Sequence, residues 1–190
     1  MNLQTLRRRF EQLLESIVIA LVGALAALVI AGFVFRYLGH ALSWYDELAS
    51  IGLVWLTYYG SALAALRGAH IGVPGFVNAM PPGARLFATL FAEACVFLFF
   101  IVLAVTGFQV LHVLGDDRMV SLDWMPLRVT QSAIPIGAVL FIVAEALRLP
   151  KVLADARGAG FVDLEVAEAL EQAGVAAPDA AQSPDRETRP

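Results

Sequence analysis

The feature that most constrains this chain is a run of twenty uncharged residues, Ser16 to Phe35, between Glu15 and Arg36. At about 1.5 Å of rise per residue, a helix over this run would be about 30 Å long, which matches the hydrocarbon core of a bilayer. Similar apolar runs recur over residues 48–66, 86–115 and 129–144. Because a segment in lipid must satisfy its backbone polar groups internally, these runs predict four membrane-spanning helices.

The pattern therefore predicts an all-α integral membrane protein, with spans over about residues 14–36, 46–67, 86–112 and 127–148. Composition agrees, because 59% of the residues are hydrophobic and 16% are charged, against about 45–50% and about 25% in soluble domains. We expect residues 1–150 to form one four-helix transmembrane bundle. Residues 151–190 are expected to form a cytoplasmic tail, with a short amphipathic helix over 161–172 and then a disordered end.

The distribution of basic residues predicts the orientation. One side of the predicted bundle carries Arg7, Arg8, Arg9, Arg67, Arg85, Arg148, Lys151 and Arg157, whereas the other carries Arg36, Arg118 and Arg128. Loops rich in Lys and Arg stay in the cytoplasm. Both termini and the second loop are therefore expected in the cytoplasm, with the first and third loops facing the periplasm or exterior.

Two shorter segments are expected to lie at the cytoplasmic surface of the membrane. Residues 3–14 alternate arginines with apolar residues at helical spacing, so this amphipathic segment is expected to lie along the interface before turning into the first span. Between the second and third spans, Ile71 to Met80 is too short to cross, and Pro74 suits the first turn of a short interfacial helix. Gly68 is expected to end the second span, and Pro135 to kink the fourth.

Glu93 is the charged residue that lies furthest inside a predicted span. Intramembrane acids often mark a function, so one interpretation is a proton or ion site. The alternative, which we prefer, is a carboxyl group that is protonated or hydrogen-bonded to a serine, a tyrosine or a partner subunit. Glu145 and Arg148 are expected to form a helix pair at the membrane surface with little consequence.

Cofactors and catalysis are not expected. Haem bound between helices needs paired histidines at one depth, and the predicted topology places His40, His70 and His112 at different ends or in a loop. The lone Cys95 is expected to be a buried structural thiol. No metal-ligand cluster, catalytic constellation or basic nucleic-acid patch stands out. A haem-bearing or haem-free anchor subunit of an oxidoreductase complex remains the alternative function.

Several motifs recur in an order typical of one family. Trp44-Tyr45-Asp46-Glu47 opens the second span, Trp55 to Gly60 runs along it, and Arg67-Gly68-Ala69-His70-Ile71-Gly72-Val73 ends it. Gly107 and Ile134-Pro135-Ile136-Gly137 follow in the later spans. Over Ser16 to about Pro150, the chain resembles the small membrane subunit (Q, DctQ-like) of tripartite ATP-independent periplasmic (TRAP) transporters. It departs from that pattern at Pro74, where an acidic residue often follows the valine.

The resemblance implies a scaffold that holds no transport site of its own. In this family, a periplasmic solute-binding protein delivers a carboxylate-bearing solute to a large membrane subunit, which moves it in an elevator-like motion driven by sodium. The implied partners are these two proteins and the phospholipid bilayer. The motif residues would order the second helix and its cytoplasmic turn, or would act as ordinary interfacial anchors: Trp44, Glu47, Trp55, Gly60, Arg67 and His70.

The third loop completes the set of expected contacts. Asp116, Asp117, Arg118 and Asp123 are expected either to contact the solute-binding protein or to be merely solvated.

Overall fold

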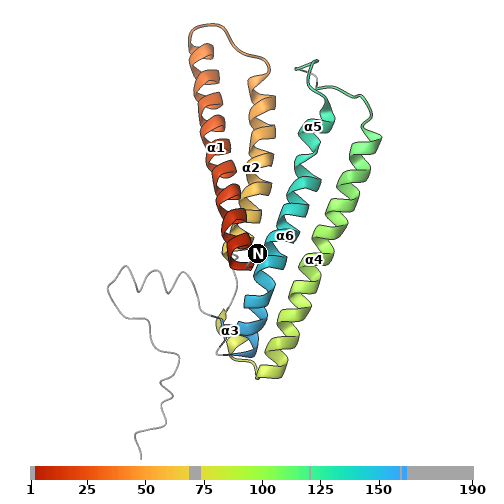
Figure 1. Cartoon of the computed structure of the whole chain (residues 1–190). Helices are drawn as coiled ribbons and strands as arrows, with labels where there is room; N and C mark the ends of the chain where they lie inside the picture. Colours follow the sequence, from red (N-terminus) through yellow and green to blue (C-terminus); the bar gives the residue numbers. More distant parts are fainter. Residues whose placement is uncertain (1–2, 69–73, 120, 159, 162–190) are drawn as a thin grey trace, which may run out of the picture. The chain divides into compact units, whose positions relative to one another are not determined.

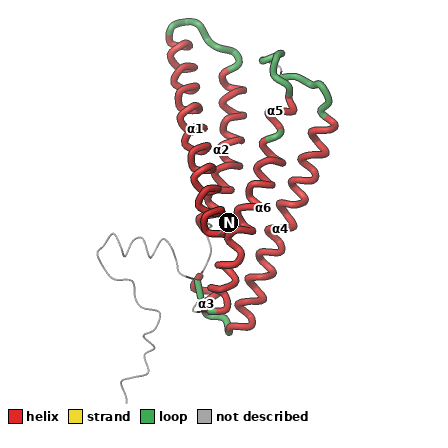
Figure 2. Tube along the Cα trace, in the orientation of Figure 1, coloured by secondary structure: helices red, strands yellow, loops and turns green. Residues whose placement is uncertain are grey.

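The computed structural model of the chain describes residues 3–68, 74–119, 121–158 and 160–161. Within these ranges the regular elements are all helices, as Figure 2 shows. In the order labelled in Figure 1 they are α1 (Leu3–Tyr37), α2 (Tyr45–Arg67), α3 (Pro74–Asn78), α4 (Pro82–Val113), α5 (Leu127–Gln131) and α6 (Ala133–Arg157).

The all-helical class is confirmed for the described residues, and so is the number of candidate spans. Among the described residues, four helical stretches are long and apolar enough to cross a membrane. They are Gln4–Tyr37, Tyr45–Arg67, Pro82–Val113 and Leu127–Arg157, the last combining α5 and α6. The predicted amphipathic helix and disordered end of the C-terminal tail lie outside the described residues.

The chain divides into two compact units, which are described separately. Unit 1 consists of Met1–His70 and Glu93–Leu149, and unit 2 of Ile71–Ala92 and Pro150–Pro190. Unit 1 therefore holds α1, α2, α5 and most of α4 and α6. Unit 2 holds α3 together with the beginning of α4 and the end of α6.

Helix α1 is continuous from Leu3 to Tyr37. The predicted turn between the amphipathic segment and the first span is therefore wrong. At about 1.5 Å per residue, 35 residues make a helix of about 52 Å, well beyond the roughly 30 Å of a hydrocarbon core. Arginines and glutamates in the first part are good helix formers and do not interrupt the backbone hydrogen bonds, so the helix continues through them.

The helices of unit 1 pack in the spatial order α1, α2, α6, α4 (Figure 1). Helix α1 lies along α2, where the absence of a side chain at Gly32 leaves room for the ring of Tyr45. Helix α2 meets α6 where Tyr58 covers Gly137. Helix α6 meets α4 where the rings of Phe100 and Phe141 stack, with centroids 3.7 Å apart.

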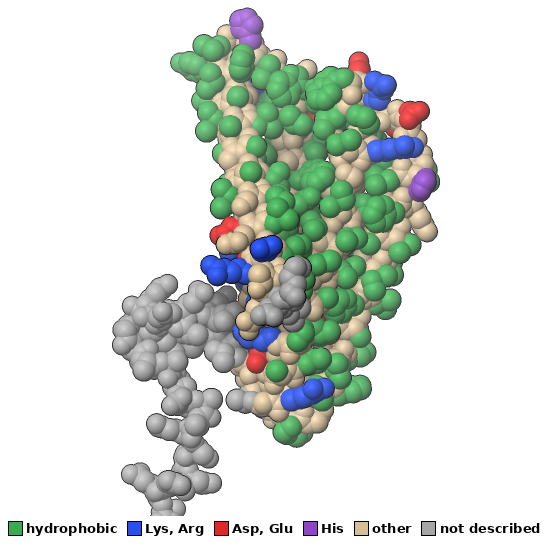
Figure 3. All heavy atoms as spheres, viewed as in Figure 1, with side chains coloured by type: hydrophobic (Ala, Val, Ile, Leu, Met, Phe, Trp, Pro, Cys, Tyr) green, Lys and Arg blue, Asp and Glu red, His purple; other side chains and the backbone are tan. Residues whose placement is uncertain are grey.

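The buried core of unit 1 gathers where α1 begins and α2 ends. Its buried members are Leu14, Ala62, Leu63, Ala65, Leu66, Phe141 and Ala144. Large apolar side chains such as Phe33 and Phe99 are mostly exposed instead. Hydrophobic side chains cover the visible face along the helices in Figure 3, a surface suited to lipid rather than water.

The fourth span is interrupted close to Pro135. Helix α5 ends at Gln131, Ser132 is its C-cap, and α6 begins at Ala133. Proline lacks the N–H that would bond to the carbonyl of Gln131, so the predicted irregularity has its expected cause. The buried Pro135 packs on Gly107 of α4, where an added Cβ would lie 3.0 Å from the proline Cδ. Helix α6 continues through Pro150 to Arg157.

Unit 2 is held together by side chains that bind backbone groups. Asn78, the last residue of α3, donates from Nδ2 to the Phe161 carbonyl at 2.8 Å and accepts from the Phe161 N–H at 2.9 Å. The buried Arg85 donates from Nε to the Ala156 carbonyl at 2.8 Å and also bonds Gly158. The two bonds of Arg85 satisfy free carbonyls at the end of α6. Helix α3 begins at Pro74 as expected; its position at a membrane surface stays a prediction.

Candidate functional site

The predicted site residues of α2 are spread along its whole length, so they do not form one site. We call the two ends of this helix the Glu47 end and the Arg67 end. Trp44 is the N-cap residue at the first end, without a side-chain capping bond. Gly68 is the C-cap at the second end, with φ +76°, and its N–H bonds the carbonyls of Ala64 and Ala65. The helix therefore ends where predicted, because glycine tolerates this left-handed conformation.

At the Glu47 end, one carboxylate joins α2 to the loop between α4 and α5. Glu47 Oε2 accepts a hydrogen bond from the backbone N–H of Ser121 at 3.1 Å. The loop folds back on itself, since the Met119 N–H bonds the Met125 carbonyl and Arg118 Nη1 bonds the Asp123 carbonyl. The buried Met119 side chain anchors it. Glu47 thus joins the beginning of α2 to an exposed loop.

The middle of α2 combines an aromatic pair with an open glycine. Trp55 stacks on Tyr59 one turn later, with centroids 5.6 Å apart and ring planes at 26°. Gly60 follows, and a Cβ built there would meet no atom within 4 Å. By contrast, the same construction at Gly137 would meet the side chain of Tyr58. Gly60 is therefore not needed for packing within the described part of this chain.

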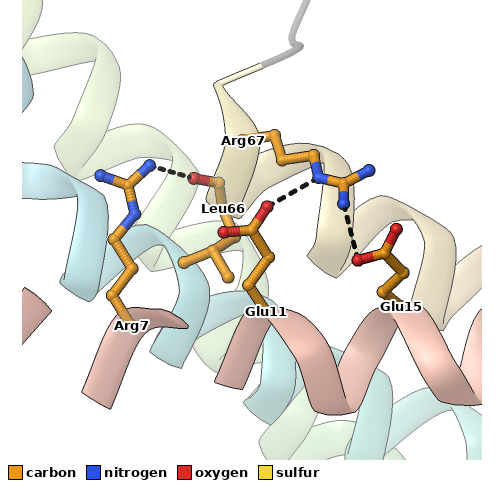
Figure 4. A network of polar contacts seen from close by, with 5 residues as sticks. All are labelled: Arg7, Glu11, Glu15, Leu66 and Arg67. Atoms are coloured by element: carbon orange, nitrogen blue, oxygen red, sulfur yellow. Dashed lines mark hydrogen bonds and ion pairs between the residues drawn. The ribbon is translucent and has the colours of Figure 1, made fainter. Parts of the chain in front are cut away.

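At the Arg67 end, an exposed network joins α2 to α1 (Figure 4). Arg67 contacts Glu11 Oε1 at 2.9 Å through Nε and Glu15 Oε2 at 3.1 Å through Nη2. The two glutamates are four residues apart, so they lie on the same face of α1. Arg7 donates to the Leu66 carbonyl at 2.9 Å, which satisfies a free acceptor at the end of α2. Exposed ion pairs contribute only about 0–1 kcal/mol each to stability. This network therefore chiefly sets how α1 is oriented against the end of α2.

A second polar cluster lies buried between α4 and α6. We call Glu93, Glu145 and Arg148 the buried triad. Arg148 Nη2 lies 3.4 Å from Glu93 Oε1 and 3.1 Å from Glu145 Oε1. The side chains of Glu145, Glu93 and Arg148 are only 3%, 12% and 18% exposed. Arg148 also passes Gly68, where a Cβ would lie 3.7 Å from its Nη1. The guanidinium group thus lies near the negative end of the α2 dipole.

The buried triad corrects two expectations. Glu145 and Arg148 were expected to form an inconsequential surface pair, whereas Glu145 is almost completely buried. The partner found for Glu93 is Arg148 of the same chain, rather than a serine or a tyrosine. Buried charges are rarely left unpaired. The sequence did carry a signal of the pair: an acid directly follows the apolar run of 129–144, and a basic residue follows one helical turn later.

The remaining predicted residues are placed as follows. His70 lies outside the described residues. Cys95 is exposed rather than buried, so the expectation of a buried thiol is wrong. His40 is exposed and its Nδ1 lies 3.1 Å from the Leu38 carbonyl. Among the described residues, no group of three His, Cys, Asp or Glu side chains could hold a metal ion.

Comparison with known proteins gives one family. Residues 25–154 match the family described as tripartite ATP-independent periplasmic transporters, DctQ component. The chain is 27% identical over 177 residues to the sialic acid TRAP transporter small permease protein SiaQ of Vibrio cholerae, covering 88% of this chain and 99% of the relative. It is 29% identical over 112 residues to the C4-dicarboxylate TRAP transporter small permease protein DctQ of the same species, covering 58% of this chain and 48% of that relative.

Proposed function

Because this chain belongs to the DctQ component family of tripartite ATP-independent periplasmic transporters, we propose that it is the scaffold subunit beside a large membrane subunit. That subunit would move an organic acid in an elevator-like motion, using a sodium gradient, after a periplasmic solute-binding protein delivers the acid. Membership of a transporter family favours this role over an oxidoreductase anchor. The family match, which runs from α1 into α6, is the observation that carries the proposal.

The distribution of polar groups supports a scaffold rather than a conduit. Arg148 forms ion pairs with the two buried glutamates, and Arg67 forms ion pairs with the two glutamates of α1. A transport path needs polar groups that are free to exchange partners with a solute or an ion. In the described helices of unit 1, these charged groups instead join one helix to another.

The exposed apolar helix faces support a partner in the membrane. Ile19, Ile30 and Phe33 of α1 are each more than half exposed, as are Phe91 and Phe99 of α4. Lipid and a second membrane protein are both suited to such faces, because association in membranes depends on close packing rather than on exclusion of water. We propose that the large subunit covers part of this surface.

We further propose that the Arg67 end of α2 lies on the cytoplasmic side, together with both chain termini. The excess of Lys and Arg on that side supports this orientation. The loop held by Glu47 would then face the periplasm, where its exposed Asp116, Asp117 and Arg118 are available to the solute-binding protein.

The names of the two relatives support the class of solute. One is named for sialic acid and the other for C4-dicarboxylates. Both are carboxylate-bearing compounds, so we propose an organic acid as the solute without naming it.

Reconstitution tests the scaffold role. A candidate large subunit and a candidate solute-binding protein from the same organism would be purified, and uptake of radiolabelled organic acids into proteoliposomes measured with and without this chain. We expect uptake only when all three proteins and an inward sodium gradient are present. Uptake by this chain alone would contradict the proposal, and so would an undiminished rate when it is omitted. The isolated chain in the same vesicles is the matched control.

A further inference from the structure

The buried triad contains more negative than positive charge. It joins α4 to α6 through two carboxyl groups and a single guanidinium group. If all three groups were ionised, one negative charge would remain in a segment that is expected to lie in lipid. An uncompensated charge in such an environment is expensive, so another species is needed to balance the triad.

Three atoms of the buried triad lack hydrogen-bond partners. They are Glu93 Oε2, Glu145 Oε2 and Arg148 Nε, each with almost no accessible surface. Buried polar atoms in proteins are almost always paired, so the two unpaired carboxyl oxygens need an explanation. The Glu145 side chain is 97% buried, since only 3% of it is exposed, which leaves little access for bulk water.

We propose that the buried triad binds one proton, which the carboxyl groups of Glu93 and Glu145 share. The two carboxyl groups meet at one guanidinium nitrogen, because Arg148 Nη2 lies 3.4 Å from Glu93 Oε1 and 3.1 Å from Glu145 Oε1. A protonated carboxyl group is a donor and an ionised one is an acceptor, so a single proton satisfies an oxygen on each residue. The proton belongs to the pair rather than to either residue. One carboxylate then balances Arg148, and the triad is electrically neutral.

Other charged groups nearby do not supply the missing balance. Among the described residues, the ion pairs of Glu93 and Glu145 are both made with Arg148. On the neighbouring helices, Arg67 is engaged by two glutamates of α1, and Arg7 bonds the Leu66 carbonyl. A metal cation would have to approach the guanidinium group closely, which repels it. A single proton both balances the charge of the triad and gives the two unpaired carboxyl oxygens a hydrogen bond.

The proton has a structural consequence that does not depend on transport. With the proton bound, two glutamates and one arginine hold α4 against α6 without net charge. The same arginine also passes Gly68 at the end of α2. The site is therefore a proton-binding site inside the proposed scaffold. Its test uses the full chain in lipid nanodiscs and needs no partner protein, so failure of the proposed transport role would leave it intact.

Infrared spectroscopy tests the proton directly. In heavy water at neutral pH, a protonated carboxyl group gives a C=O stretching band that is separate from the bands of carboxylates. We expect this band in the wild-type chain, and we expect both Glu93→Gln and Glu145→Gln to abolish it. Glu11→Gln is the matched control, because its carboxylate is exposed and paired with Arg67; this change should leave the band intact. A wild-type spectrum without the band would overturn the proposal.

Thermal stability gives a second, independent pattern. Either single Gln substitution leaves one carboxylate for Arg148, so we expect the apparent Tm to change by only a few degrees. The double variant Glu93→Gln/Glu145→Gln leaves a buried cation unpaired, and its Tm should fall by on the order of 10 °C. Single variants as unstable as the double variant would contradict a shared proton. A Tm that rises with sodium concentration, without the infrared band, would assign the site to a metal cation instead.

Discussion

Arg148 on α6 contacts Glu93 on α4 across 55 residues of sequence, with Nη2 and Oε1 3.4 Å apart. The same nitrogen lies 3.1 Å from Glu145, one helical turn earlier on α6. One arginine thus connects the fourth candidate span to the third. Among the polar contacts of unit 1, we expect the loss of this one to lower the stability of the chain most.

Replacing Arg148 should destabilise the chain far more than replacing Arg67. Arg148→Met leaves two buried carboxyl groups without their cation, which should lower the free energy of unfolding by about 3–5 kcal/mol. Arg67→Met removes an arginine that is 43% exposed, and it should cost only about 0–1 kcal/mol. Thermal unfolding of both variants in the same detergent measures the difference. Equal losses would show that burial of the triad does not matter.

Gly137 and Gly23 should respond oppositely to the same substitution. Gly137→Ala places a methyl group against the side chain of Tyr58, where α2 and α6 meet, and overpacking of this kind costs about 1–3 kcal/mol. Gly23→Ala meets no atom within 4 Å and should be neutral or slightly stabilising. The measurement is again thermal unfolding of the isolated chain. If Gly137→Ala proved neutral, the close approach of these two helices would be in doubt.

Gly60 separates packing within this chain from packing against a partner. Because an added Cβ at Gly60 would meet no atom within 4 Å, Gly60→Leu should leave the Tm of the isolated chain nearly unchanged. If the large subunit covers this part of α2, the same variant should reduce co-purification of that subunit several-fold. Gly23→Leu on α1, where an added Cβ likewise meets no atom within 4 Å, is the comparison. Unchanged co-purification of the Gly60 variant would place the partner elsewhere.

Glu47 should control the order of the loop between α4 and α5. Glu47→Gln weakens the hydrogen bond to the Ser121 N–H from a charged to a neutral one, and Glu47→Ala removes it. Amide hydrogen exchange in peptides covering residues 117–126 should therefore speed up progressively in the two variants. Asp116→Asn, an exposed acid in the same loop, should leave exchange there unchanged. Identical exchange in Glu47→Ala and the wild-type chain would rule out this anchoring role.

Arg85 should hold the end of α6 within unit 2. Arg85→Gln removes the bonds to the carbonyls of Ala156 and Gly158, so exchange of amides in residues 152–160 should accelerate. Arg157→Gln is the control, because Arg157 is exposed at the same end of the helix. Equal exchange in the two variants would mean that Arg85 does not hold this helix end.

Some local features could be predicted because their causes lie within a few residues. Gly68 ends α2 in a left-handed conformation, and Pro135 interrupts the hydrogen bonding of the fourth span. The turn expected after residue 14 did not follow from any such local cause. No glycine or proline breaks α1 there, and the amphipathic pattern alone did not specify where that helix would bend.

By itself, the sequence determined that four helices are long and apolar enough to cross a membrane, because a segment in lipid must satisfy its own backbone hydrogen bonds. That requirement is local, and twenty uncharged residues are enough to meet it. Only the tertiary structure decided that Glu93 faces Arg148, that Glu145 is buried beside them, and that Tyr58 packs on Gly137. These contacts depend on the rotation of each helix and on which helices are neighbours, and both are set by side-chain packing between segments far apart in the chain.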